Sequence, residues 1–150
     1  DVDLDGGKGD DIMTMSGTYD EATLKGGDGN DTMTGGGGDD TMTGGSGNDS
    51  FVFGTEGGSD EIKDFADGDT ITFDGSEFNL DDMVITQSGS DSVITFGGSG
   101  TEDVSVKIKG VDADDLQKDL DTARDEGSQD GGYSISEGSD DTISITFEGS

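Results

Sequence analysis

Aspartates recur at fixed intervals in the first half of the chain, each one closing a run of glycines. The clearest copies are residues 26–34 (GGDGNDTMT), 35–43 (GGGGDDTMT) and 44–52 (GGSGNDSFV), and residues 6–14 (GGKGDDIMT) are a fourth. All four fit the formula G-G-x-G-x-D-x-U-x, in which U is a large apolar residue. Carboxylate and carbonyl oxygens are the ligands that a hard cation such as Ca²⁺ prefers. The spacing therefore predicts a row of calcium sites.

The same phase continues through less regular copies. Residues 15–25 are two residues too long, yet they keep Asp20 at the sixth place and Leu24 two residues before the next glycine pair. Residues 55–63 and 64–72 also have an aspartate at the sixth place and isoleucine at the eighth. A disordered acidic linker would not keep apolar residues in a strict phase, so the repeat predicts structure.

The composition requires a source of stability other than a large apolar core. The chain has 150 residues, 37 acidic against 7 basic, a formal charge of -30 and 29 glycines. So much charge with so few large apolar residues is typical of disorder. Bound divalent cations would resolve this conflict, because the free energy of ion binding then contributes to folding.

The residue inventory also excludes several functions. Seven basic residues make no patch for phosphates or for an anionic membrane, and no apolar run approaches the roughly 18 residues of a spanning helix. The absence of His and Cys excludes disulfides, thiolate nucleophiles and histidine-based catalytic sites. Paired carboxylates of a glycosidase remain formally open, but periodic aspartates within glycine loops are what an ion cage requires. We therefore expect no catalytic residues. The chain starts without Met and shows no signal peptide, so we expect a fragment of something longer.

Each nonapeptide divides into six loop residues and three strand residues. Glycine permits the backbone angles of such a loop and lets carbonyl oxygens turn inward. The U residues should form the interior, and their flanking residues, mostly threonine, should face solvent. The inward set is Met13, Leu24, Met33, Met42, Phe51, Ile62 and Ile71.

Two nonapeptides make one coil, so loops on one edge come from alternate repeats. Asp11, Asp31 and Asp49 should share the first edge, and Asp69 should return to it. The second edge should hold Asp20, Asp40 and Asp60, and the loops of Asp20 and Asp60 lack the full glycine set.

The rest of the chain predicts a β-rich cap containing one short helix. Residues 83–86 and 92–96 predict a hairpin around Gln-Ser-Gly-Ser, and residues 104–108 alternate as a half-buried strand. Asp112 is placed to cap a helix that ends before Gly127, and a last strand runs through residues 143–147. We expect two parts, a roll over residues 1–73 and a cap over residues 74–150, packed as one structural unit.

The nonapeptides resemble the RTX family, the haemolysin-type calcium-binding repeats of secreted bacterial proteins. The resemblance covers residues 6–72, and Asp64-Phe65 is similar to the way that family leaves its repeats. It implies an all-β fold, a right-handed parallel β-roll. It also implies about four Ca²⁺ ions, between Asp11 and Asp31, Asp31 and Asp49, Asp20 and Asp40, and Asp40 and Asp60. Loop carbonyls would complete each site; the candidates are Gly7, Gly9, Gly26, Gly27, Gly29, Gly35, Gly36, Gly38, Gly44, Gly45 and Gly47.

The resemblance further implies type I export from a Gram-negative bacterium, with folding outside the cell where calcium is abundant. The leading interpretation is a monomeric calcium-binding module that stabilises or chaperones a larger extracellular protein. Two alternatives stay open: a carbohydrate-binding or substrate-guiding module of a polysaccharide-modifying enzyme, and a structural segment of a surface adhesin. Exposed aromatic rings would favour a polysaccharide ligand, and only Tyr19 and Tyr133 offer a hydroxylated ring.

Overall fold

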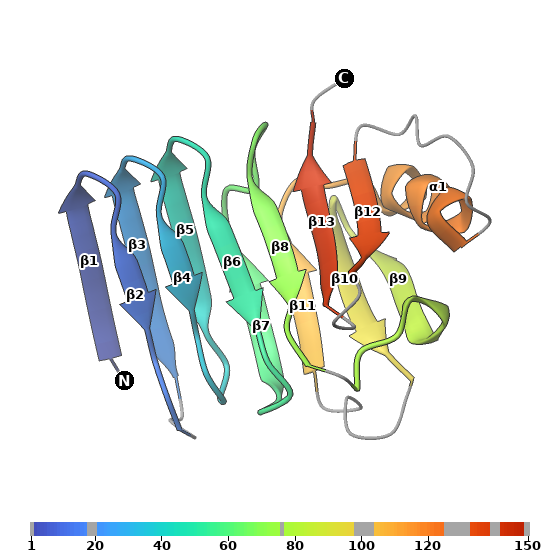
Figure 1. Ribbon diagram of the computed structural model, residues 1–150, viewed down its shortest axis with the longest axis horizontal. Helices are drawn as coiled ribbons and strands as arrows, with labels where there is room; N and C mark the ends of the chain where they lie inside the picture. The colour runs from blue at the N-terminus through green and yellow to red at the C-terminus, as the bar shows by residue number, and fades with distance from the viewer. Residues whose placement is uncertain are drawn as a thin grey trace.

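The chain forms two β-sheets that face each other across a narrow interior. The computed structural model describes residues 2–17, 21–75, 77–97, 104–124, 133–138 and 142–148. Successive strands of the repeat region alternate between the sheets, so the chain winds as a parallel solenoid of about three coils (Figure 1). The strands of the solenoid are β1 (Val2–Lys8), β2 (Ile12–Thr14), β3 (Ala22–Asp28), β4 (Thr32–Thr34), β5 (Thr41–Ser46), β6 (Ser50–Phe53), β7 (Gly58–Ile62) and β8 (Thr70–Phe73). The predicted parallel β-roll is confirmed.

The interior of the roll is one layer of U residues. In the first sheet Leu4 lies beside Leu24 and Leu24 beside Met42, and in the second sheet Met33 lies between Met13 and Phe51. Every predicted inward residue is buried, the most exposed being Met13 at 8%. Each coil therefore contributes about two large side chains to the core, which is thin by the standard of a globular domain.

The two sheets differ in strand length, which the repeat alone did not predict. Three-residue strands are found in β2 and β4, whereas β1 and β3 have seven residues each. The longer strands continue into the following glycine pair, because Gly7 lies in register with Gly27 and Gly27 with Gly45. The division into six loop and three strand residues is therefore wrong for the first sheet, where backbone pairing extends into the loop.

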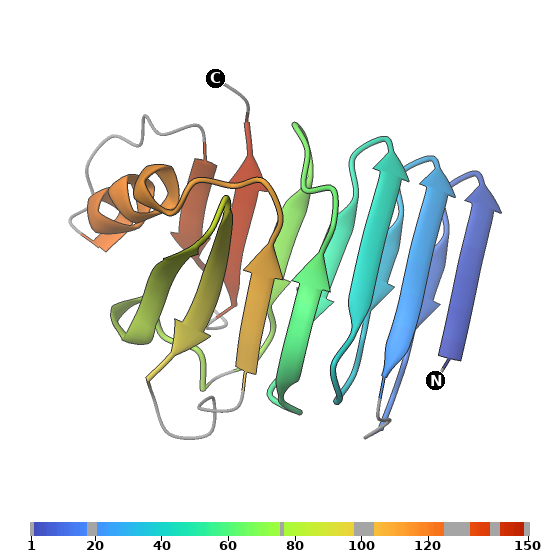
Figure 2. The same cartoon turned by 180° about the vertical axis from the view of Figure 1, so that it is seen from behind.

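The C-terminal part extends both sheets. Its elements are a 3-10 turn (Leu80–Asp82), β9 (Met83–Ser88), β10 (Asp91–Phe96), β11 (Val104–Ile108), α1 (Ala113–Arg124), β12 (Tyr133–Glu137) and β13 (Ile143–Phe147). Strand β11 pairs in parallel with β7, and β13 pairs antiparallel with β8 (Figures 1 and 2). The predicted hairpin is β9–β10, and the predicted strands at 104–108 and 143–147 are β11 and β13. Strand β12 was not predicted.

The helix lies over the end of the sheets opposite to the N-terminus (Figure 1). The Asp112 carboxylate accepts the Asp114 amide at 2.8 Å, as a capping residue does. Leu116 and Leu120 are fully buried against the core. The predicted end of the helix, before Gly127, falls outside the described residues. No helix of the described residues is long and apolar enough to cross a membrane.

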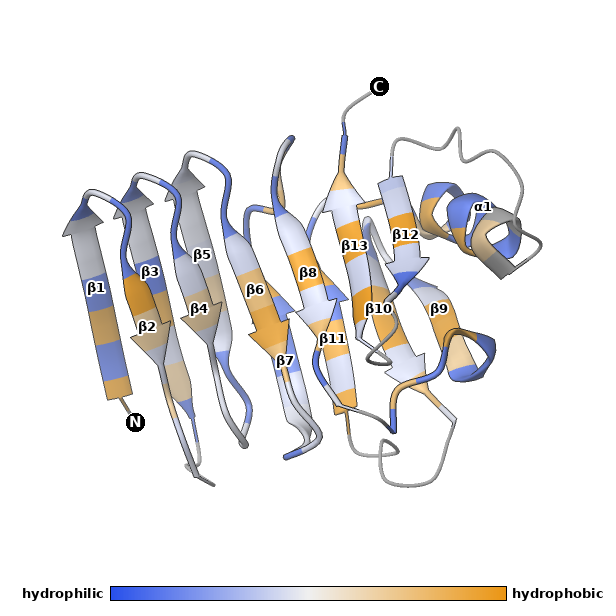
Figure 3. Cartoon of the chain, in the orientation of Figure 1, coloured by the Kyte–Doolittle hydropathy of each residue, from blue (hydrophilic) through white to orange (hydrophobic). Residues whose placement is uncertain are grey.

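Aromatic rings replace the single U residues where the roll meets the cap. The Phe73 ring centroid lies 4.9 Å from that of Phe96, and Phe96 lies 4.9 Å from Phe78. The ring centroids of Phe65 and Tyr133, which stack on each other, lie 6.4 Å apart. Strands β8, β10, β11 and β13 carry apolar bands (Figure 3). The hydrophobic stabilisation of this chain is concentrated here.

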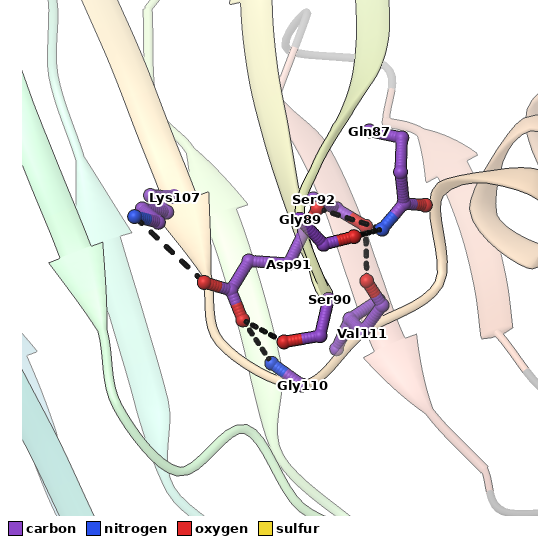
Figure 4. Close-up of polar contacts among 8 residues, drawn as sticks. All are labelled: Gln87, Gly89, Ser90, Asp91, Ser92, Lys107, Gly110 and Val111. Atoms are coloured by element: carbon purple, nitrogen blue, oxygen red, sulfur yellow. Dashed lines mark hydrogen bonds and ion pairs between the residues drawn. The ribbon is translucent and has the colours of Figure 1, made fainter.

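A polar junction fastens the β9–β10 hairpin to the segment before the helix (Figure 4). The buried Ser92 hydroxyl donates to the Val111 carbonyl at 2.6 Å. Asp91 accepts the Gly110 amide at 2.8 Å and pairs with Lys107 at 3.7 Å, and these contacts lower the pKa of its carboxyl. Gln87 donates to the carbonyl oxygens of Gly89 and Asp91. The polar groups of this junction are thus hydrogen-bonded or ion-paired with one another, as expected of a structural contact.

Candidate metal centre

The sixth-place aspartates stack in the predicted columns. On the first edge, Oδ1 of Asp31 accepts the Asp11 amide at 2.8 Å. In the same way Asp49 accepts the Asp31 amide at 2.9 Å, and Asp69 accepts the Asp49 amide at 2.8 Å. On the second edge Asp60 accepts the Asp40 amide at 2.9 Å. Asp40 in turn accepts the amide of Ala22 at 2.9 Å, so Ala22 rather than Asp20 stands in register with Asp40, and Asp20 itself lies outside the described residues. Asp31, Asp40, Asp49, Asp60 and Asp69 thus each use one oxygen to hold the preceding loop.

The second oxygen of these aspartates is buried without a hydrogen-bond partner. This holds for Oδ2 of Asp11, Asp31, Asp40 and Asp49. Asp31, Asp40 and Asp49 are themselves at most 2% exposed. A buried carboxylate oxygen that accepts no hydrogen bond costs roughly several kcal/mol, so such atoms fit a cation site. Four of them at equivalent places in a repeat are the central observation of this site.

The first-place glycines form a cradle around these oxygens. A Cβ built on Gly6 would lie 2.5 Å from Oδ2 of Asp11 and 2.7 Å from the Gly26 carbonyl oxygen. At Gly26 the same position would collide with Oδ2 of Asp31 and lie 2.5 Å from the carbonyl oxygen of Gly44. A carboxylate oxygen of one loop and a carbonyl oxygen of the next therefore converge on one small space. Ca²⁺ takes oxygen ligands at about 2.3–2.6 Å, so this cradle has the right donors.

Glycines at the second and fourth places have a different role. Gly27 and Gly29 have φ angles of 109° and 132°, a region that only glycine enters without strain. A side chain on either would collide with the carbonyl oxygens of Gly7 and Gly9, which point at the next loop. The carbonyls of Gly27 and Gly29 point in the same way at Gly45 and Gly47. These four carbonyls are among the predicted ligands, and the structure directs them between the loops.

The second edge is built less regularly. A Cβ on Gly35 would collide with Oδ2 of Asp40, as in the other cradles, but the next nearest atom is the methyl carbon of Met42 at 2.6 Å. The Gly38 carbonyl points at Gly58 of the following loop. The Gly17 carbonyl accepts the Gly37 amide at 3.0 Å and is partly used by that bond. This edge brings together Asp40, Asp60 and the Gly38 carbonyl with fewer converging oxygens than the first edge.

Fifth-place side chains form a second ladder that the sequence reading missed. Asp10 accepts the Asn30 amide, and Asn30 accepts the Asn48 amide, both at 2.8 Å. On the other edge Asp39 accepts the Ser59 amide at 2.8 Å. These bonds run towards the following loop, whereas the sixth-place bonds run towards the preceding one. The signal was available, because every full copy of the repeat has Asp or Asn at its fifth place.

The last loop of the first edge, residues 64–69, departs from the pattern. An aspartate, Asp64, stands at its first place, and its two oxygens accept the amides of Gly44 and Gly45 at 2.8 Å each. Oδ2 of Asp69 accepts the amide of Ala66 in its own loop at 2.8 Å. Both oxygens of Asp69 are therefore occupied, in contrast to Asp49. Asp69 stands in the predicted column, but its outward oxygen is closed by protein.

Burial and mutual repulsion raise the pKa values of several sixth-place aspartates. Burial is the largest cause that raises the pKa of Asp40 to about 6, of Asp60 to about 7 and of Asp69 to about 6. Burial also raises the pKa of Asp49, and nearby Asp31 and Asp64 raise it further. A dication between the loops would reverse these penalties, because it favours the charged form of each carboxyl.

The residues present fit Ca²⁺, and the fit depends on loop carbonyls. Among the described residues, no three acidic side chains come close enough to hold a metal by themselves. The cradles at Gly6 and Gly26 instead bring one carboxylate oxygen without a protein partner together with a carbonyl oxygen of the next loop. Calcium accepts such mixed oxygen sets of roughly six to eight ligands. When bound, the ion would supply positive charge between anionic loops, and the chain's own residues fix their spacing.

A sugar-binding groove finds no support from the aromatic residues. Tyr133 is 6% exposed and packs against Phe65 and Phe147, so it is a core residue. Tyr19 lies outside the described residues.

Comparison with known proteins agrees with the geometry of the loops. Residues 16–51 match the family of RTX calcium-binding nonapeptide repeats, a unit of four copies. No curated protein matches the chain. Repeats of this family bind Ca²⁺, act as a structural module rather than a catalytic one, and are typical of secreted proteins. The matched range includes the irregular copy at residues 15–25 and begins after the copy at residues 6–14.

Proposed function

Because residues 16–51 match the family of RTX calcium-binding nonapeptide repeats, we propose that this chain folds on binding Ca²⁺ after secretion. In this role it is the calcium-dependent stabilising module of a larger extracellular protein. Ca²⁺ binding itself follows from the repeats. The coupling of binding to folding is supported by the four buried, unpartnered carboxylate oxygens, which would destabilise the coils without a cation.

The proposed ions lie between consecutive loops of one edge. On the first edge the ligands would be Asp11 and Asp31 with the carbonyls of Gly7, Gly9 and Gly26, and then Asp31 and Asp49 with those of Gly27, Gly29 and Gly44. On the second edge Asp40 and Asp60 would share an ion, and the pair of Asp20 and Asp40 completes the proposed set of about four. We propose that residues 1–73 and 74–150 act as one unit, because both sheets and the core continue from one part to the other.

A calcium titration followed by both calorimetry and far-UV circular dichroism tests this proposal. We expect about four ions to bind while β structure appears, because ordering the coils and filling their cradles are one process. An identical spectrum in chelator and in millimolar calcium would contradict coupled folding, even if ions bind.

Gly26→Ala tests whether the cradle is the binding site. The added methyl group would occupy the space between Oδ2 of Asp31 and the Gly44 carbonyl. We expect the calcium affinity to fall about tenfold or more, since overpacking of this kind costs about 1–3 kcal/mol. Gly97→Ala is the matched control, because a Cβ there would meet its nearest neighbour only at 3.9 Å. Equal affinities in the two variants would argue against this cradle.

A further inference from the structure

The loop at residues 64–69 joins the roll to the cap by hydrogen bonds and aromatic contacts. The Gly68 amide donates to the Phe147 carbonyl at 2.7 Å, and the Phe147 amide donates to the Asp69 carbonyl at 3.0 Å. Phe65 lies in the aromatic cluster, 6.1 Å from Phe147 and 6.4 Å from Phe51. This loop is thus anchored in the part of the chain that has the largest apolar core.

The next loop towards the N-terminus, residues 44–49, loses its backbone partner at this point. Strand β5 pairs with β7 only at Thr41 and Met42, and the Lys63 amide makes the last bond to the Met42 carbonyl at 3.0 Å. In the preceding coil the equivalent pairing continues to Gly27 with Gly45 and Asp28 with Ser46. The amides of Gly44 and Gly45 would therefore face a gap, and the Asp64 carboxylate accepts both.

The other loops of this edge cannot make this contact, because their first residue is glycine: Gly6, Gly26 and Gly44. Between those loops the proposed cation would bridge the oxygens of the cradles. Between loops 44–49 and 64–69, a side-chain carboxylate already bridges the two, and the Asp49 amide is held by Asp69 at 2.8 Å.

We propose that Asp64 is a metal-independent clamp that holds loop 44–49 in its calcium-binding conformation before the ion binds. This inference rests on the proposed calcium-dependent folding and names the residue that prepares this loop for its ion. A loop ordered in advance loses less conformational entropy when the ion binds, so its ion binds more tightly than it would to the same loop not yet ordered. Asp64 is a positioning residue in this scheme and need not touch the ion.

The charge of Asp64 and its hydrogen bonds should have opposite effects on the stability of the calcium-free protein, so one substitution distinguishes the two roles. Its carboxylate lies close enough to Asp49 and Asp69 to raise the pKa of both. If Asp64 acted only as a charge, Asp64→Asn would relieve repulsion and stabilise the calcium-free protein. If it acts as a clamp, the same substitution destabilises loop 44–49, because an amide side chain offers one acceptor oxygen to two N–H donors.

Residue-resolved amide hydrogen exchange of the full chain in chelator measures the clamp directly. We expect the Gly44 and Gly45 amides to be protected in the wild-type chain and to exchange about tenfold faster in Asp64→Asn, as loss of a charge-assisted bond implies. Asp67→Asn removes the same charge from an exposed position in the same loop and should leave both amides unchanged. The calcium midpoint should rise in Asp64→Asn and stay near wild type in Asp67→Asn.

Several outcomes would overturn the clamp. Unprotected Gly44 and Gly45 amides in the wild-type chain would do so without any variant, as would slower exchange in Asp64→Asn. If Asp64→Asn fails to fold even in calcium, Asp64→Glu keeps the charge and displaces both oxygens, and the clamp requires faster exchange there too. A circular dichroism spectrum that does not change with calcium would instead contradict the proposed function. The hydrogen exchange measured in chelator would then still test the clamp by itself.

Discussion

The coils of the roll and the C-terminal cap are built on the same two sheets and solve the problem of stability differently. A coil such as residues 22–40 buries about two large side chains and leaves two carboxylate oxygens, those of Asp31 and Asp40, without a partner. The cap buries Phe78 and Phe96 in contact with each other and with Phe73 at the end of the roll, and the polar groups of its junction are hydrogen-bonded. The difference teaches that a fold can exchange apolar area for ion binding, coil by coil, without changing its backbone arrangement.

Calcium removal should separate the two regions most strongly. In chelator we expect amides of β3 and β4 to lose their protection, because the loops that they connect repel one another, while amides of β10 and β11 remain protected by the apolar core. Hydrogen exchange with and without calcium measures this contrast. A uniform loss of protection over the whole chain would mean that the cap depends on bound calcium as much as the coils do.

Asp31→Ala should be the most damaging single substitution within the ladder. Asp31 holds the Asp11 amide with one oxygen and faces the next loop with the other, so it serves two intervals. We expect native mass spectrometry to show the loss of up to two ions, against one for Asp11→Ala at the end of the column. The unpaired Asp11 amide adds about 1–3 kcal/mol of instability. Equal ion loss in both variants would mean that the loops bind ions singly.

Acidification should weaken calcium binding by about tenfold between pH 7 and pH 5.5. The pKa values of Asp40 and Asp60 are raised to about 6 and 7 in the folded chain, from 3.8, and calcium must displace the protons of these two proposed ligands. In chelator the sign is opposite. The folded chain binds protons more tightly than the unfolded chain, so its stability should increase as pH falls from about 7 to about 4. Calorimetry in two buffers of different ionisation enthalpy, which counts the released protons, and melting in chelator check both statements.

Ser92→Ala should have the smallest effect and should not depend on calcium. It removes the buried hydroxyl that donates to the Val111 carbonyl at 2.6 Å, which costs about 1 kcal/mol. Thermal unfolding in chelator and in calcium should show the same loss of cap stability. A loss that appears only with calcium would place this junction within the ion ladder.

The repeat was enough to predict the roll, its interior and its columns, because these depend on spacing alone. Met33 and Asp31 are each defined by their place in a nonapeptide, and any stacking of nonapeptides puts them where they are. Strand β11 joining β7, and β12 joining β13, could not be predicted, because such pairing links segments about 45 or 10 residues apart with no repeated signal.

Within the site, the sequence did not predict which atom of each residue makes which contact. The formula marks the aspartate at its sixth place but not which oxygen faces the preceding loop. In the sequence Asp64 is only the first residue of a less regular copy of the repeat. In the structure it makes two hydrogen bonds to the loop before it. The first-place glycines were assigned to backbone freedom, whereas Gly26 is needed because a side chain would fill the cradle.

The opposed side-chain bonds between loops have a mechanical consequence. Fifth-place residues such as Asn30 bond forward along the axis and sixth-place residues such as Asp31 bond backward, so neighbouring coils are stitched in both senses. A chain stretched from its N-terminal edge should therefore yield one winding at a time, releasing 18 or 20 residues with each rupture. The force needed to rupture each winding should increase with calcium concentration. The mechanical resistance of the roll would therefore be set by the calcium in its surroundings.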